Sequence, residues 1–316
     1  MRAQPRRGLM AGKTLISIVG PTGIGKTNLA IRLAEHWGTE IVSADSRQFY
    51  KEMSIGTAVP SVSDLHRVKH HFIQHKSILD PYSVGDFERD ALALLDVLFA
   101  KHRTVILVGG SGLYVDAVNK GLDVFPNIDP NIRNELNNVL SEYGLGPLQS
   151  RLQELDPEHY EKIDRENPHR LIRALEVCMG TGKPYSSFLG AKKEQRPFRA
   201  ITLGIRADRE VVYARIDQRV DQMMANGLLE EARSLEKHKG LNALQTVGYK
   251  ELFSYFEGQC DLEFAVSEIK KNSRRFAKRQ LTWFKKNEDT IWVDYDADIK
   301  AVISQVETRL KLEGYE

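Results

Sequence analysis

A short segment near the N-terminus has the residue types and spacing of a phosphate-binding loop. Gly20, Gly25, Lys26 and Thr27 occupy the fixed positions of the pattern G-x-x-x-x-G-K-[ST]. Between the two glycines stand Pro21, Thr22, Gly23 and Ile24. The backbone N–H groups of such a loop, the start of the following helix and the Lys26 ammonium all attract an anion. The segment therefore predicts a site for a di- or triphosphate compound, and it leaves open whether the phosphate itself is transferred.

The flanking sequence supplies the elements that such a loop needs. An apolar run at 15–19 predicts a strand before the loop, and residues 27–36 predict a helix after it. Further segments alternate in the same way, with strand-like runs at 40–44, near 71–73 (a weak one) and at 104–108, and a helical pattern at 87–102. This alternation is typical of α/β folds, so we expect a P-loop NTPase-like parallel sheet as the core.

The rest of the chain divides into an insertion and a return to the core. Residues 121–197 predict a helical insertion domain. Four prolines are expected to break it into short helices: Pro130, Pro147, Pro157 and Pro168. A strand at 198–205 then resumes the α/β pattern, and C-terminal helices are expected at about 209–226, 228–237 and 261–287. We therefore assign residues 1–120 and 198–316 to the core.

The composition is that of a soluble globular protein, with 41% hydrophobic and 28% charged residues. A net charge of +2 gives no general sign of a nucleic-acid binder, so any such sign must be local. The two cysteines, Cys178 and Cys260, lie far apart, which favours reduced thiols in a cytosol. No apolar run is long enough to cross a bilayer. We expect a cytoplasmic monomer with no membrane partner.

The strand predicted at 104–108 ends in glycines, where many P-loop ATPases and GTPases carry an acidic magnesium ligand. Residues 109–112 read Gly-Gly-Ser-Gly. Glycines allow close backbone approach but cannot ligate a metal through a side chain. This argues against ordinary nucleotide hydrolysis, although a distant acid could substitute.

Asp45 follows the strand predicted at 40–44. The carboxyl ends of parallel strands meet at one edge of a sheet, so Asp45 is expected beside the phosphate loop. A carboxylate there can coordinate Mg²⁺ or accept a proton from a nucleophile. Asp is also well suited to cap a helix, and its position alone leaves both interpretations open.

Two arginines stand four residues apart in the helix expected at 209–226. Arg215 and Arg219 share one face of that helix, and their guanidinium groups suit phosphate oxygens. The alternative is a solvated charged face, which periodicity alone favours slightly.

The segment 270–286 contains eight basic residues and no acidic one. On a helix Lys271, Arg274, Arg275 and Lys278 form one stripe, and aromatic residues interleave with it: Phe276, Trp283 and Phe284. Such a pattern suits an RNA backbone with unstacked bases. The alternative is a solubilising helix whose aromatic residues face the core.

Taken together, these motifs resemble those of the bacterial tRNA dimethylallyltransferases, the MiaA-type tRNA prenyltransferases. The matching segments cover most of the chain: 20–27, 43–50 with 55–58, 80–83, 109–114, 167–176, 247–249 and 278–283. Apart from the phosphate loop, each motif alone is a weak signal, but all of them together in this order are highly specific for the family.

The resemblance implies transfer of a dimethylallyl group from dimethylallyl diphosphate to N6 of the adenosine 3′-adjacent to the anticodon in tRNA, with release of diphosphate. The loop at 20–27 would hold the diphosphate. In such enzymes the residue matching Asp45 is the general base, and those matching Thr27 and Arg219 hold the diphosphate. Lys26 and Mg²⁺, to which Thr27 would contribute, neutralise the leaving group.

The same matching implies contacts with the tRNA anticodon stem-loop, with the target base extruded from its stack. The residues concerned are Asp45, Ser46, Arg47, Gln48, Ser111, Arg133, His169, Arg170, Leu171, Ile172, Arg173, Gln245, Gly248, Tyr249, Lys250, Arg274, Arg275, Lys278, Arg279, Gln280, Trp283 and Lys285.

Three rival functions explain parts of the pattern. A P-loop kinase for a small metabolite accounts for the phosphate loop but not for the glycine-ended strand or the basic segment. A prenyltransferase acting on free AMP or ADP has no need of an RNA surface. A non-catalytic RNA-binding module with a P-loop has no need of Asp45 as a base.

Overall fold

A computed structural model describes residues 12–190 and 195–312 of the chain. These residues form two compact units. One combines the described parts of 1–120 and 196–316, and the other is formed by the described parts of 121–195. Within the described ranges, no helix is both long enough and apolar enough to cross a membrane.

The first unit is built on a six-stranded sheet with the order β3-β2-β4-β1-β5-β6, and all of its strand pairs are parallel. The strands are β1 (Thr14–Val19), β2 (Ile41–Ser43), β3 (His70–His71), β4 (Thr104–Val108), β5 (Arg199–Arg206) and β6 (Ile291–Asp294). This confirms the predicted parallel sheet. Its strands could be found in the sequence because parallel strands are buried on both faces and therefore appear as continuous apolar runs. The short edge strand β6 was not predicted.

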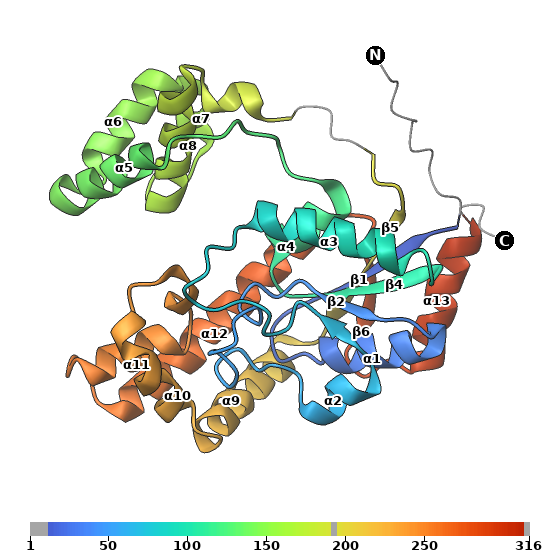
Figure 1. The fold of residues 1–316 in the computed structure, drawn as a ribbon. Coiled ribbons are helices and arrows are strands. Elements are labelled where there is room, and N and C mark those ends of the chain that lie inside the picture. The colour runs from blue at the N-terminus through green and yellow to red at the C-terminus, as the bar shows by residue number, and fades with distance from the viewer. Residues whose placement is uncertain (1–11, 191–194, 313–316) are drawn as a thin grey trace, which may run out of the picture. The chain divides into compact units, whose positions relative to one another are not determined.

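Helices cover both faces of this sheet (Figure 1). They are α1 (Lys26–Trp37), α3 (Val84–Leu98), α4 (Gly112–Lys120) and α13 (Ile299–Leu312). The short helix α2 (Val62–Arg67) has no buried residue. Side chains alternate along a strand, so Ile16 and Ile18 join one core with α1 and α13, while Leu15 and Val19 join a second with α3 and α4. The central strand β1 is thereby fixed from both sides.

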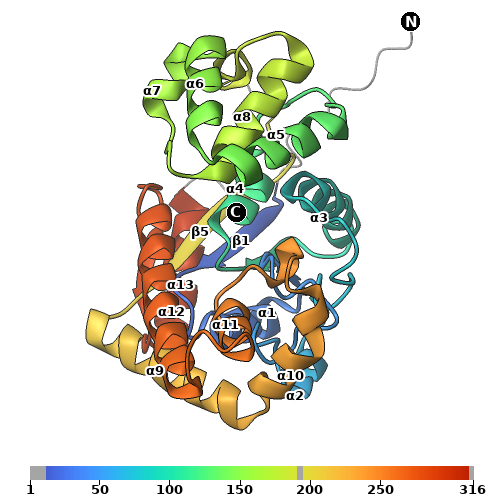
Figure 2. The ribbon, with the colours of Figure 1, turned by 90° about the vertical axis from the view of Figure 1, so that its left-hand side faces the viewer.

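Four further helices gather into a group of their own, drawn in yellow to orange in Figures 1 and 2. They are α9 (Arg209–Ala225), α10 (Leu228–Leu235), α11 (Tyr249–Phe256) and α12 (Leu262–Phe284), with the short 3₁₀ helices η2 (Glu236–His238) and η3 (Asn242–Leu244) between them. Leu228, Tyr249 and Ile269 pack here against Met53 from the segment after β2. The helix group is therefore joined to the sheet unit through a shared core. The helices expected at 209–226, 228–237 and 261–287 are confirmed, whereas α11 was not predicted.

The second unit is a helical bundle, shown in green in Figure 2. It contains α5 (Pro130–Tyr143), α6 (Gly146–Leu155), α7 (Pro157–Lys162), α8 (Pro168–Thr181) and the 3₁₀ helix η1 (Tyr185–Phe188). The four prolines divide this unit into short helices as expected, and each proline stands in the first turn of one helix. There the missing N–H costs no hydrogen bond, so proline begins a helix rather than ending it.

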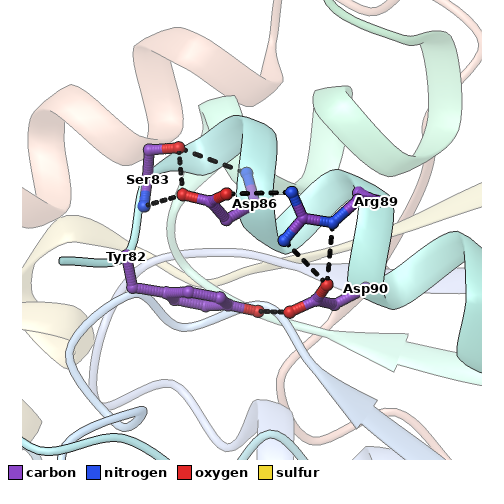
Figure 3. Close-up of polar contacts among 5 residues, drawn as sticks. All are labelled: Tyr82, Ser83, Asp86, Arg89 and Asp90. Atoms are coloured by element: carbon purple, nitrogen blue, oxygen red, sulfur yellow. Dashed lines mark hydrogen bonds and ion pairs between the residues drawn. The ribbon is translucent and has the colours of Figure 1, made fainter. Parts of the chain in front are cut away.

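Helix α3 begins three residues earlier than its predicted start at 87, because Ser83 forms a capping box (Figure 3). The Ser83 hydroxyl accepts from the backbone N–H of Asp86 at 3.2 Å, and the Asp86 carboxylate accepts from the N–H of Ser83 at 3.0 Å. The Ser83 hydroxyl also donates to the Asp86 carboxylate at 2.7 Å, and this bond, together with the one from the Ser83 backbone, lowers the pKa of Asp86. Arg89 then joins Asp86 to Asp90, which also accepts from the Tyr82 hydroxyl at 3.1 Å.

Replacing Ser83 with alanine leaves the first turn of α3 uncapped. We expect the free energy of unfolding in urea to fall by about 1 kcal/mol. The matched Ser83→Thr variant keeps the hydroxyl and should lose much less. Equal losses in the two variants would show that the cap does not stabilise the helix.

Candidate active site

The site forms where three adjacent strands end. The phosphate loop follows β1, Asp45 follows β2 and Gly109 follows β4, the strand that lies between the other two. The carboxyl edge of a parallel sheet is where ligands bind in open α/β folds. The expected position of Asp45 beside the phosphate loop is therefore what the sheet order produces.

The phosphate loop has the geometry of an anion cradle. Gly25 has a φ of 109° and is the residue from which α1 begins, a conformation that favours glycine. Lys26 turns back over the loop, and its Nζ donates to the carbonyl oxygen of Pro21 at 2.7 Å. Burial lowers the pKa of Lys26 to about 8, even though the Asp45 carboxylate acts in the opposite direction. The loop thus holds a cation that an anion would stabilise.

Helix α9 brings both predicted arginines to this loop. Arg215 donates from Nε to the carbonyl oxygen of Gly23 at 2.9 Å, so it supports the loop backbone. Arg219 lies deeper, and burial lowers the pKa of its guanidinium while Asp45 opposes the shift. Both arginines thus lie at the phosphate loop, and their role in binding an anion stays a prediction.

Asp45 is held by a turn and caps no helix. The backbone N–H of Arg47 donates to Asp45 Oδ1 at 3.1 Å, and the N–H of Gln48 donates to the Asp45 carbonyl at 3.1 Å. The next helix along the chain begins only at Val62. The Asp45 side chain thus remains directed to the site.

Two cavities meet at Asp45. One, of about 490 Å³, is lined by Lys26 and Thr27 together with other residues of the phosphate loop. The other, of about 560 Å³, is lined by side chains of α12 and by the segment 245–248. Thr22, Asp45 and Arg219 line both. A ligand in either cavity can therefore reach the same carboxylate.

The second cavity brings together many of the residues for which tRNA contact was predicted. Those in its wall are Asp45, Ser46, Arg47, Ser111, Gln245, Gly248, Lys250, Arg279, Gln280 and Trp283. Ser46 and Ser111 are joined by their hydroxyls at 3.1 Å, and Arg47 donates to the carbonyls of Asn242 and Ala243 at 2.8 and 3.0 Å. The residues of this wall come from segments that lie far apart in the sequence and are brought together by the fold.

Gln280 connects α12 to the phosphate loop. Its Oε1 accepts from the backbone N–H of Thr22 at 2.9 Å, and its Nε2 donates to the carbonyl of Gly110 at 2.9 Å. The side chain is 5% exposed, so both amide atoms act within the protein. A Cβ on residue 110 would lie 2.3 Å from that nitrogen, which explains the glycine in the loop after β4.

The basic segment is only partly a free surface. Arg275, Lys278, Arg279 and Lys285 are exposed. In contrast, Arg274 is bound to Asp217 at 2.6 Å and Lys271 to Glu268 at 2.7 Å. The aromatic residues differ as well: Phe276 is 38% exposed, Trp283 donates from Nε1 to Asp116 at 2.7 Å, and Phe284 belongs to the core. Part of the basic segment is therefore engaged within the protein, and RNA binding by its exposed cations stays a prediction.

The remaining predicted contacts are less accessible or lie in the helical bundle. Gln48 and Tyr249 are buried. In the bundle, Leu171 and Ile172 are core residues, whereas His169 and Arg170 are exposed at the start of α8. Arg133 and Arg173 both bind the Glu176 carboxylate, at 2.6 and 3.2 Å. The expected tRNA contacts of these residues stay predictions.

Sequence reasoning missed the carboxylate of Glu231 on α10. It accepts hydrogen bonds from the backbone of residues 54–56, about 175 positions earlier in the chain. No local pattern marks Glu231, because an acid in the first turn of a helix is common.

Comparison with known proteins identifies the family. The family model described as IPP transferase matches residues 48–287. The chain belongs to the IPP transferase family. A tRNA dimethylallyltransferase from Christiangramia forsetii is 59% identical over 94% of this chain and 98% of its own length. One from Flavobacterium johnsoniae is 58% identical over 95% and 99%.

Solved structures agree with this assignment. The tRNA isopentenylpyrophosphate transferase from Bacillus halodurans matches with a TM-score of 0.69 and 36% identity, over 95% of this chain and 99% of that one. A eukaryotic dimethylallyltransferase acting on tRNA has the same fold, with a TM-score of 0.75 at 24% identity, over 94% and 77%. The α/β fold predicted from the sequence is thus that of the family.

The pKa of Lys26 makes a prediction about anion binding. An anion raises this pKa above its value of about 8 in the free protein. Diphosphate binding at pH 8.5 should therefore take up protons, and above pH 8 the affinity should fall by up to about tenfold per pH unit. Calorimetry with inorganic diphosphate in buffers of different ionisation enthalpy measures both.

The Lys26→Met variant is the control, because diphosphate titrates identically in both experiments. It should bind more weakly and lack the extra proton uptake. The same uptake in wild type and variant would assign the titration to another group.

Proposed function

We propose that this family member transfers a dimethylallyl group from dimethylallyl diphosphate to N6 of the adenosine 3′-adjacent to the anticodon in tRNA, releasing diphosphate. One observation carries the proposal: the Asp45 carboxylate lines both the cavity of the phosphate loop and the cavity walled by α12. A general base between a donor site and an acceptor site is what alkyl transfer to an amine requires.

The diphosphate would lie in the first cavity. Loop N–H groups, Lys26 and Arg219 supply positive charge where negative charge develops on the leaving group. Thr27 and Asp45 both line this cavity, and hydroxyl and carboxylate oxygens are ligands that suit Mg²⁺. We propose that Thr27 helps to hold that ion, which would add to the charge opposing the diphosphate.

The adenine would enter from the second cavity. Its N6 forms a bond to C1 of the prenyl group as the C1–O bond breaks, and the electron pair of that bond leaves with the diphosphate. The N6 proton passes to the Asp45 carboxylate.

The second cavity has features that suit an extruded base. Phe276 and Trp283 offer aromatic surface in its wall, and Arg279 lies over the Phe276 ring at 5.7 Å. Stacking on such groups is the usual way of holding an unpaired base. Lys278 and Lys285 lie exposed on the same helix or just after it, where they could meet phosphates. We propose a monomer that acts in the cytoplasm, where bacterial tRNA is found.

Asp45→Asn removes the base while keeping the size of the side chain. We expect single-turnover prenyl transfer to tRNA to slow by about a hundred- to ten-thousandfold, with tRNA affinity little changed. Asp296→Asn is the control, because Asp296 is exposed and follows the end of β6 at Asp294. Unchanged turnover in Asp45→Asn would remove Asp45 from the base role.

The exposed cations of α12 make a second prediction. Replacing Arg275, Lys278 and Arg279 with alanine should weaken tRNA binding at low salt. It should also reduce the slope of log K against log salt by about two, since each neutralised phosphate releases counterions and contributes about 0.7 to 0.9.

The control replaces three exposed lysines elsewhere: Lys237, Lys300 and Lys311. It changes the net charge equally and should leave most of the slope in place. If both triple variants bind tRNA like wild type, the exposed cations of α12 do not bind tRNA, and free AMP becomes the better candidate for the acceptor of the prenyl group.

A further inference from the structure

Glu231 on α10 is the centre of a group of hydrogen bonds outside the cavities. Its Oε2 accepts from the backbone N–H groups of Ser54 and Ile55, at 2.9 and 2.8 Å. Its Oε1 accepts from the N–H of Gly56 at 2.9 Å and from the Tyr249 hydroxyl at 2.6 Å. All four partners donate, so the site requires a group that only accepts.

Tyr249 and Gly56 fit each other closely. The Tyr249 side chain is fully buried, and a Cβ on residue 56 would lie 2.6 Å from its ring. Residues 54–56 are therefore held from two directions, by the carboxylate and by the ring. This leaves little freedom to the segment that follows.

The segment that follows, Thr57 and Ala58, is hydrogen-bonded to the Gln48 side chain. The Gln48 side-chain nitrogen donates to the carbonyls of Thr57 and Ala58, at 3.2 and 2.9 Å. The Gln48 backbone N–H in turn donates to the carbonyl of Asp45 at 3.1 Å and closes the turn that carries it. A continuous path of hydrogen bonds and backbone thus runs from Glu231 to the carboxylate in the site.

The same segment also forms cavity wall. Gly56 and Thr57 line the cavity next to α12, and Ala58 lines the cavity of the phosphate loop. Displacement of residues 54–58 would therefore change both the walls and the turn at Asp45. Helix α10, which supplies Glu231, follows directly on α9, which supplies Arg219.

We infer that Glu231 is a positioning residue for prenyl transfer: it fixes residues 54–58 and, through Gln48, the orientation of Asp45. The inference rests on the proposed role of Asp45 as the base. Tyr249, expected from the family resemblance to contact tRNA, acts in the free protein as the second anchor of this group.

Glu231→Gln tests the inference directly. An amide offers N–H groups to partners that are themselves donors, so at least one bond must break while the size is kept. We expect the single-turnover rate at saturating tRNA and dimethylallyl diphosphate to fall about ten- to a hundredfold. The dissociation constants for tRNA and inorganic diphosphate should stay within about twofold, because the groups that bind them remain.

Glu230→Gln is the matched control, on the adjacent exposed residue of the same helix. Tyr249→Phe removes only one of the four donors, and it provides a milder variant should Glu231→Gln fail to fold. It should slow transfer less than Glu231→Gln. Rates equal to wild type in folded Glu231→Gln, or in Tyr249→Phe if that is the only folded one, would overturn the inference.

A double-mutant cycle separates positioning from general loss of stability. If Glu231 acts through Gln48, the rate of Glu231→Gln with Gln48→Ala should match that of the slower single variant. Independent, multiplying losses would overturn the path. A wild-type protein that transfers no prenyl group would overturn the proposed function and this inference together, whereas an active wild type with an equally active Glu231→Gln overturns the inference alone.

Discussion

Buried positive charge at the end of β1 is the constraint on which the rest of the site depends. Lys26 and Arg219 are both withdrawn from water far enough to lower their pKa values, and Asp45 opposes both shifts. Burying a charge is costly unless an opposite charge compensates it. The arrangement is therefore one that a bound diphosphate would stabilise, and its cost must be met by the surrounding fold.

The fold meets this cost by holding each charged group from a separate element. The sheet order sets the ends of β1, β2 and β4 side by side, α9 carries Arg219, and α12 reaches the phosphate loop through Gln280. Helix α12 also presents the exposed cations for which tRNA binding is proposed. Helix α12 thus contacts the phosphate loop and also carries the surface proposed to bind tRNA.

Local sequence pattern predicted the parts of this site that are local. The phosphate loop, the strands around it and the expectation that Asp45 lies beside it follow from spacing and from the geometry of parallel sheets. The contact of Gln280 with Thr22 joins residues 258 positions apart, and no periodicity reveals such a pair. The same is true of Glu231 and residues 54–56.

Other features of the fold have equally specific causes. The prolines at 130, 147, 157 and 168 begin helices because the first turn needs no N–H from them. The edge strand β6 is only four residues long, too short for a pattern to be distinct. The charges of the basic segment are evident from the sequence. Its pairing with the acidic residues Asp217 and Glu268 is not, because it depends on the fold.

The central claim is that the group beyond the diphosphate is transferred, and that tRNA receives it. The most direct measurement offers the protein dimethylallyl diphosphate, ATP, AMP and unmodified tRNA together, and analyses all products by mass spectrometry. We expect one prenyl group on an adenosine of tRNA for each diphosphate released, with ATP and AMP unchanged. Phosphate transfer from ATP, or prenylated AMP beside unmodified tRNA, would contradict it.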